Sequence, residues 1–205
     1  MMKTEQKQNQ LSQIRAMVDQ VHDLQNLGIE PGIKESIVCL WAMAFNTNAS
    51  CEGHLDHGLG GPWADIGKEM PKITFDKANI KRKIFLRIAK VLKKTSLVSD
   101  KLLQGLEIHL IVPYTREMRR QKKLFQRENL QQQMQLVGLL EEFYKNREVS
   151  TDVRLIIEIA AGRLISQGAR FRELRSSEEK EKKLKEYKEE MSAFTNFLKK
   201  KYFEK

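Results

Sequence analysis

The chain has 205 residues, of which 40% are hydrophobic and 31% are charged, a composition typical of a globular protein that is long enough to bury a core. No stretch approaches the roughly 18 apolar residues that a membrane-spanning helix needs, so no membrane partner is expected. Two cysteines are too few for a disulfide framework, and the N-terminal residues show no apolar secretory segment, so the predicted compartment is the cytoplasm.

The formal net charge of +10 is concentrated in one part of the chain. Residues 71–127 carry sixteen basic and four acidic side chains, whereas residues 31–70 carry two basic and five acidic ones. A strongly basic segment therefore follows directly after an acidic one.

Two helices are predicted at the start of the chain. Apolar residues from Leu11 to Leu24 recur at three- and four-residue steps, which predicts an amphipathic helix closed by Gly28. Pro31 suits the first turn of a second helix, which is apolar nearly all round and is expected to be buried and to stop around Asn46. A glycine-rich loop follows, and Pro62–Ile66 is a candidate short strand.

The middle of the chain is predicted to contain a basic helix, a strand and a long helix. Apolar residues at helical spacing mark the basic helix, from about Thr74 to Leu92. The run LEIHLIV, Leu106–Val112, predicts a strand ended by Pro113. Met118–Tyr144 is predicted to be one long helix.

The last part of the chain predicts a hairpin and a closing helix. Residues 153–159 and 163–166 are the strands of the hairpin, with Gly162 in its turn. Ser176 and Glu179 form a capping-box pattern before a helix over residues 177–203, which is expected to pack on the rest of the chain. The predicted fold is a helix-rich single α+β domain over residues 1–205 with a small, mainly antiparallel sheet. These patterns do not predict the oligomeric state.

Residues 48–67, NASCEGHLDHGLGGPWADIG, combine a cysteine, two histidines and five of the eleven glycines. Glycines permit positive φ, and consecutive backbone N–H groups in such a turn can bind an anion. The leading hypothesis is therefore a protein that binds a phosphate-bearing ligand such as a nucleotide or RNA, and whether it also processes that ligand is left open by these residues. In this interpretation Cys51 and His54 are the candidate catalytic residues, and the candidate ligand-binding residues are Ser50, Glu52, Gly53, Asp56, His57 and Asp65.

A metal site is the first alternative for the same segment. Cys51, His54 and His57 have the spacing C-x2-H-x2-H, and nearby carboxylates add oxygen donors. Zinc binds thiolate, imidazole and carboxylate, and catalytic zinc sites combine three protein ligands with a water molecule. This pattern predicts a metal-dependent enzyme.

Two further alternatives use the segment differently. Cys51 could act as a nucleophile if a neighbouring imidazolium lowered the pKa of its thiol. The glycine-rich loop could also be a scaffold turn in a non-catalytic interaction module.

Two resemblances to known proteins involve this segment. The runs ASCEGHLDHG and PWADI, together with the closing EYKEEM and FLKKKY, resemble uncharacterised bacterial proteins with an S-C-E-G-H signature. That resemblance spans most of the chain and implies no activity. Ser50, Cys51 and Gly53 are also similar to the T-T-S-S-C-S-G-R turn of the tRNA-wybutosine methyltransferase family, with Glu52 and His54 in place of its serine and arginine. This second, local resemblance implies a ligand pocket where a helix, a turn and a strand meet.

The basic segment predicts contact with nucleic acid, because neutralised phosphates release counterions. Its candidate residues are Lys81, Arg82, Lys83, Arg87 and Lys90 on the predicted basic helix, and Arg119, Arg120, Lys122 and Lys123 at the start of the long helix. A solvated helix face is the alternative explanation. No helix-turn-helix or paired zinc-finger pattern is present in the sequence, so recognition of backbone or shape is expected.

Overall fold

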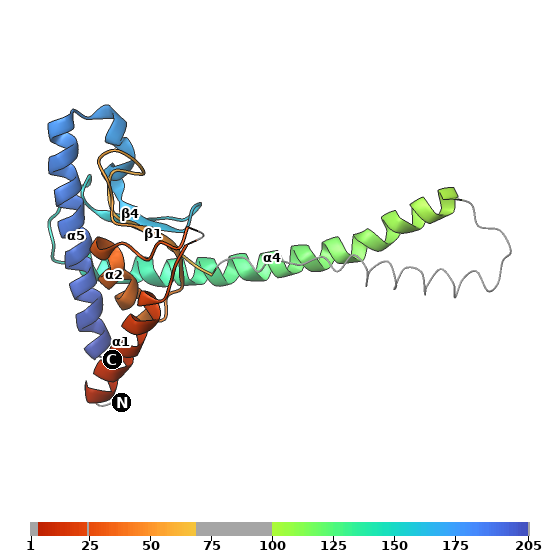
Figure 1. Cartoon of the computed structure of the whole chain (residues 1–205), viewed down its shortest axis with the longest axis horizontal. Coiled ribbons are helices and arrows are strands. Elements are labelled where there is room, and N and C mark those ends of the chain that lie inside the picture. The colour runs from red at the N-terminus through yellow and green to blue at the C-terminus, as the bar shows by residue number, and fades with distance from the viewer. Residues whose placement is uncertain (1–3, 24, 69–99, 205) are drawn as a thin grey trace. The chain divides into compact units, whose positions relative to one another are not determined.

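The structure is a computed structural model that describes residues 4–23, 25–68 and 100–204 (Figure 1). The chain divides into two compact units, residues 1–69 with 128–205 and residues 70–127. The helix predicted over residues 74–92 lies outside the described residues, as do Lys81, Arg82, Lys83, Arg87 and Lys90. None of the helices in the described ranges combines the length and the apolar character that a membrane crossing requires.

The first unit contains helices and a small sheet, which confirms the predicted α+β class. Its helices are α1 (Thr4–Asp19), α2 (Pro31–Ala42), α5 (Ser177–Glu204) and the later part of α4 (Asp100–Tyr144), with a 3-10 helix, η1, at Gln167–Leu174. Its strands are β1 (Thr47–Cys51), β2 (Trp63–Ile66), β3 (Leu155–Glu158) and β4 (Arg163–Ser166).

The described strands form one antiparallel sheet in the order β1-β2-β4-β3. The hairpin predicted at residues 153–166 is confirmed as β3 and β4, and the strand predicted at residues 62–66 is confirmed as β2. Gly162 has φ +70° in the hairpin turn, and its N–H donates to the Glu158 carbonyl at 2.7 Å. β1 is an edge strand.

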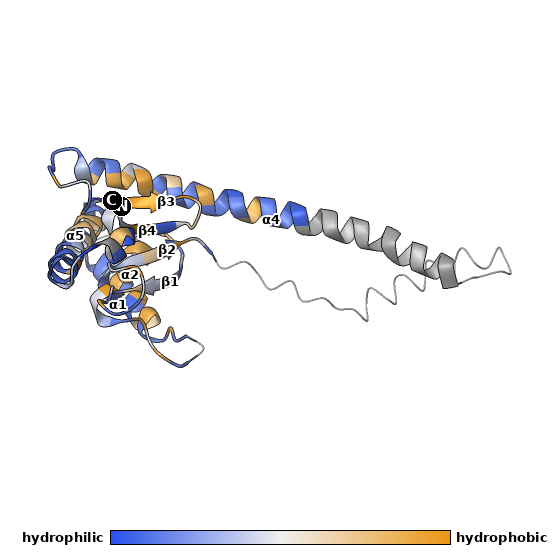
Figure 2. Ribbon diagram, turned by 90° about the horizontal axis from the view of Figure 1, so that it is seen from above, coloured by the Kyte–Doolittle hydropathy of each residue, from blue (hydrophilic) through white to orange (hydrophobic). Residues whose placement is uncertain are grey.

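α2 occupies the centre of the core, as its apolar sequence predicts. It packs against α1, α5 and β1. Ile33, Ile37 and Leu40 of α2 are almost completely buried, together with Phe194 and Leu198 of α5. Figure 2 shows the contrast between the largely hydrophobic α2 and the strongly hydrophilic outer side of α5.

Two helices end earlier than predicted. α1 stops at Asp19, before the predicted end of the helix, and the Asp23 carboxylate accepts the N–H groups of Gln25 and Leu27 at 2.8 and 2.9 Å. Such a side-chain bond competes with helical hydrogen bonding. α2 stops at Ala42, because Ala44 adopts φ +67° and the Phe45 N–H returns to the Leu40 carbonyl.

The prediction of a strand at Leu106–Val112 is wrong. These residues belong to α4, which runs through Pro113 to Tyr144. A short apolar run does not distinguish a strand from a helix by its periodicity, and here it continues the helix predicted from Met118 onward.

The capping box before α5 is confirmed. The backbone N–H of Ser176 donates to the Glu179 carboxylate at 2.9 Å, and the Glu179 N–H donates back to the Ser176 hydroxyl at 3.4 Å. The predicted packing of this helix is confirmed by its buried side chains, which include Tyr187, Met191 and Phe194.

Candidate functional site

β1 and the loop that follows it present the candidate residues. Ser50 and Cys51 lie on β1, where a loop was expected, and residues 52–62 connect β1 to β2. Gly53 has φ +82°, and a Cβ atom at this position would lie 2.6 Å from the Gly61 carbonyl carbon. A glycine is therefore required at residue 53 both by its backbone angle and by the close approach of the two arms of the loop.

Two glutamates fasten this loop to the start of α2. Glu30, the residue before α2, accepts the Glu52 N–H at 2.6 Å. In return, the Glu52 carboxylate accepts the Gly32 N–H, in the first turn of α2, at 2.7 Å. The first N–H groups of a helix have no partner within the helix, and a carboxylate there is favoured by the helix dipole. The loop is thus held to α2 by reciprocal hydrogen bonds.

Glu30 also meets His54 and Cys51. The Glu30 Oε1 and His54 Nε2 atoms are 2.6 Å apart, and both side chains are partly exposed. One ligand atom from each of Glu30, Cys51 and His54 lies within 4.8 Å of the others. The three side chains thus bring a carboxylate, a thiol and an imidazole together.

His57 occupies a different position from the one that the C-x2-H-x2-H spacing suggests. Its ring stacks on His54 with 4.2 Å between centroids and 16° between planes, and its Nδ1 is 2.8 Å from Asp56. One ligand atom from each of His54, Asp56 and His57 also lies within 4.8 Å of the others, whereas no such group among the described residues combines His57 with Cys51. The structure groups Cys51 with His54 and Glu30, and it groups His57 with His54 and Asp56.

The pKa values of Glu30 and Cys51 are shifted in opposite directions. Although partial burial raises the pKa of Glu30, the hydrogen bonds from Glu52 and His54 lower that pKa below its usual value overall. Burial, together with the charges of Glu30 and Glu52, raises the pKa of the Cys51 thiol. A reactive cysteine nucleophile needs a lowered pKa. In this environment Cys51 is a protonated thiol at neutral pH.

The other predicted ligand-binding residues have partners of their own. The Glu52 N–H donates to Glu30, and the Gly53 N–H donates to the Cys51 sulfur at 3.4 Å. Two amides of the expected anion-binding turn are therefore engaged within the protein. Asp65, on β2, accepts two hydrogen bonds from Arg163 at 2.6 and 2.9 Å.

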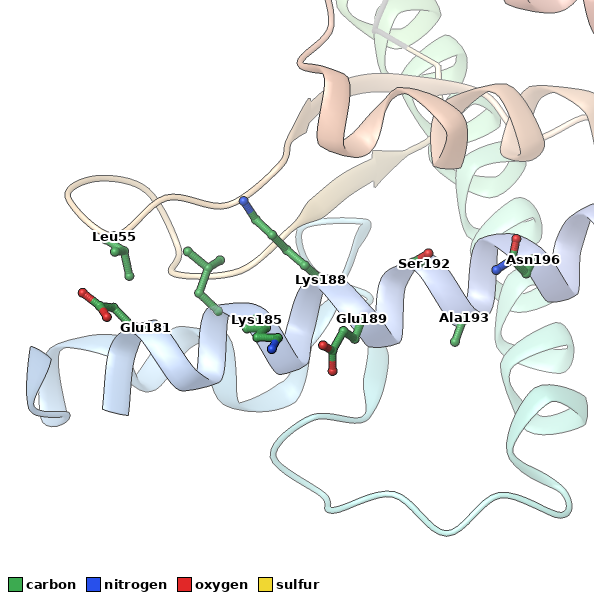
Figure 3. Close-up of a pocket in the computed structure, with 9 residues that line it drawn as sticks. Leu55, Glu181, Lys185, Lys188, Glu189, Ser192, Ala193 and Asn196 are labelled. Atoms are coloured by element: carbon green, nitrogen blue, oxygen red, sulfur yellow. The ribbon is translucent and has the colours of Figure 1, made fainter. Parts of the chain in front are cut away.

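Two grooves adjoin the loop and β1. One, of about 390 Å³, is lined by residues of segments 21–30 and 47–51 and by Trp41, and both Glu30 and Cys51 belong to its lining. The other, of about 650 Å³, is a shallow groove between Leu55 and α5. Figure 3 shows Leu55 extending from the loop towards Glu181 of α5. Only the first groove reaches the Glu30–Cys51–His54 cluster.

The second unit contains the described part of the predicted nucleic-acid surface. Arg119, Arg120, Lys122, Lys123 and Arg127 are exposed on α4, and none of them forms an ion pair with any residue that the structure describes. At four-residue spacing, Arg119, Lys123 and Arg127 follow one another on one helix face. This stretch is a continuous basic surface.

Glu30 is the member of the cluster that the sequence pattern did not reveal. It lies 24 residues before His54. The only local signal is its place directly before Pro31, at the start of a helix. Comparisons with models of protein families, with curated proteins and with solved structures found no match to this chain.

Proposed function

We propose that Glu30, Cys51 and His54 bind a divalent ion of the zinc type. The observation that supports this proposal is the mutual approach of their ligand atoms to within 4.8 Å. Thiolate, imidazole and carboxylate are the donors that zinc takes in proteins. Three protein ligands leave a fourth position for water, which is the arrangement of catalytic zinc sites.

Local charge favours a cation over an anion at this position. Glu30 and Glu52 lie at the cluster, and Asp56 lies beside His57 in the same loop. Among the described residues that line the adjoining groove there is no lysine or arginine. An ion would take the place of the Glu30–His54 hydrogen bond and would displace the proton of the Cys51 thiol, so its binding would release a proton.

The reaction class that follows is metal-assisted hydrolysis. A zinc ion lowers the pKa of a bound water to about 7, which produces a nucleophile at neutral pH. The groove that Glu30 and Cys51 line would give a substrate access to a water bound at this position. The function proposed for the cluster is that of a metal-dependent hydrolase.

Metal titration of the full-length protein tests this proposal. Zinc should bind at one ion per chain, and Glu30→Gln, Cys51→Ser and His54→Gln should each weaken binding by about tenfold or more, which corresponds to about 1.4 kcal/mol. Glu178→Gln is the matched control for Glu30→Gln, because Glu178 is exposed and lies outside both the cluster and the adjoining groove. Wild-type zinc affinity in the Cys51 and Glu30 variants would remove the proposal.

A second candidate function belongs to the basic stretch of α4 and retains the predicted partner, a nucleic acid. Arg119 and Arg127 are about 12 Å apart along the helix axis at 1.5 Å per residue. The described side chains between them include Arg120, Lys122 and Lys123 and no acidic residue. Exposed cations in this number, without an ion-pair partner among the described residues, suit binding to a phosphate backbone.

Salt dependence of RNA binding tests the second candidate. Each neutralised phosphate contributes about 0.7–0.9 to the logarithmic salt slope. Reversing Arg119, Lys123 and Arg127 to glutamate should abolish binding. Reversing three lysines of α5, Lys182, Lys185 and Lys200, changes the net charge equally and should leave most of the affinity. Equal losses in both triple variants would show that only net charge matters.

A further inference from the structure

The groove beside the proposed metal ligands follows the free edge of the sheet. β1 is an edge strand, and its residues Asn48, Ala49, Ser50 and Cys51 line the groove. The volume of about 390 Å³ lies within the roughly 300–1,000 Å³ of ligand-binding pockets. The occupant of this groove would therefore lie along a strand edge.

The backbone of Ser50 faces outward at this edge. The Ile66 N–H donates to the Gly162 carbonyl, on the β4 side of β2. Backbone groups alternate in direction along an antiparallel strand, so the N–H and C=O of Trp63 and Asp65 point to β1. Their partners in register are Cys51 and Ala49. Ser50, between them, directs its own N–H and C=O away from β2.

The side chains around the groove define what it accepts. Leu27 and Val21 are large apolar residues with 61% and 37% of their surface exposed, and Trp41 adds an aromatic wall. Asp23 and Glu30 bring negative charge, and no lysine or arginine is found among the described lining residues. An extended chain with apolar and positively charged side chains is the complement of this lining.

We propose that the groove binds an extended, cationic peptide segment that adds to β1 as a further strand. Strand addition gives affinity through main-chain hydrogen bonds, and neighbouring pockets select alternate side chains. The peptide backbone passes Glu30 and Cys51, two of the proposed metal ligands. This inference rests on the proposed metal site for its catalytic meaning, and it names an extended peptide as the substrate class.

Fluorescence anisotropy with a labelled peptide of alternating lysine and valine tests the proposal on the full-length protein. Binding should be saturable, and the same peptide with alternate backbone nitrogens methylated should bind about tenfold or more weakly, because it has lost main-chain donors. Equal binding of both peptides would overturn strand addition.

Two variants locate the binding. Leu27→Lys places a positive charge in the groove and should weaken binding by about tenfold or more. Met17→Lys is the matched control, since Met17 is similarly exposed, at 57%, and lies outside the groove lining. Ser50→Pro removes an outward N–H at an edge position that tolerates proline, and it should reduce binding without a large loss of stability. Wild-type binding in both groove variants would contradict the proposal.

The same measurements separate the two proposals. Peptide binding is measured with zinc-loaded protein and with protein treated with a chelator. Zinc binding without peptide binding would support the metal site and contradict the proposed peptide binding. Peptide binding without zinc binding would support the peptide-binding groove and contradict the proposed metal-dependent hydrolase.

Discussion

Glu30 Oε1 lies 2.6 Å from His54 Nε2, although 24 residues separate them in the chain. The same carboxylate accepts the N–H of Glu52, so one residue at the start of α2 orients both the loop and its imidazole. This relationship links the stability of the loop to the chemistry of the cluster.

Replacing Glu30 should therefore affect the fold as well as the cluster. In Glu30→Ala the Glu52 N–H and the His54 ring lose their acceptor, which should lower the free energy of unfolding by about 1–3 kcal/mol. Glu30→Gln keeps an acceptor oxygen and should cost less. Urea unfolding of the metal-free protein measures both values, and an equal cost for the two variants would contradict the proposed role of the hydrogen bonds.

His57 distinguishes the two ligand sets. Because no group of ligand atoms within 4.8 Å among the described residues combines His57 with Cys51, His57→Ala should retain one zinc ion per chain. Cys51→Ser measured in parallel should lose affinity. Loss of zinc in both variants would instead support the set of Cys51, His54 and His57 and would require the His57 ring to rotate.

Gly53 and Gly58 form a matched pair for measuring steric demand in the loop. Both have positive φ, +82° and +70°. A Cβ atom at Gly53 meets backbone atoms at 2.6–2.9 Å, whereas a Cβ atom at Gly58 meets nothing within 4 Å. Gly58→Ala should cost about 1 kcal/mol through backbone conformation alone, and Gly53→Ala should cost about 1–3 kcal/mol more. Thermal and urea unfolding give the comparison, and similar losses would show that the two loop arms separate easily.

The free energy of unfolding should depend on pH through the ionisation of Asp152. The carboxylate of this residue contacts Lys183 at 3.0 Å, Tyr187 at 3.1 Å and Arg175. Although partial burial raises the pKa of Asp152, the hydrogen bonds from Lys183 and Tyr187 and the charge of Arg175 lower it overall. A lowered folded-state pKa contributes stability above the unfolded value, about 3.9, and this contribution is lost as the pH falls through the folded value.

Asp152→Asn should therefore reduce the free energy of unfolding by about 1–3 kcal/mol at neutral pH. The difference from wild type should begin to shrink below about pH 4, where the carboxyl of the unfolded chain takes up a proton, and should disappear below the lower pKa of the folded state. Urea unfolding at several pH values measures this difference. A constant difference down to acidic pH would mean that packing against Gly168, rather than charge, determines the effect.

Local patterns in the sequence determined much of the fold. The capping box at Ser176 and Glu179, the hairpin around Gly162 and the apolar helix after Pro31 depend on residues close in the chain, and the structure confirms each of them. The apolar run at Leu106–Val112 predicted a strand wrongly, because its helical continuation lies beyond the run itself.

The sequence also identified the segment of interest, since Cys51, His54 and Gly53 lie within four residues of one another. Tertiary structure alone decided which partners they meet. Glu30 reaches the cluster because α2 packs beside β1. β1 lies at the edge because no described strand pairs with its outer side, whereas β2 pairs on its far side with β4, a strand about one hundred residues later. Side-chain chemistry and local spacing are properties of a short stretch of chain. Convergence of ligands and exposure of a strand edge depend on long-range packing, which no short stretch encodes.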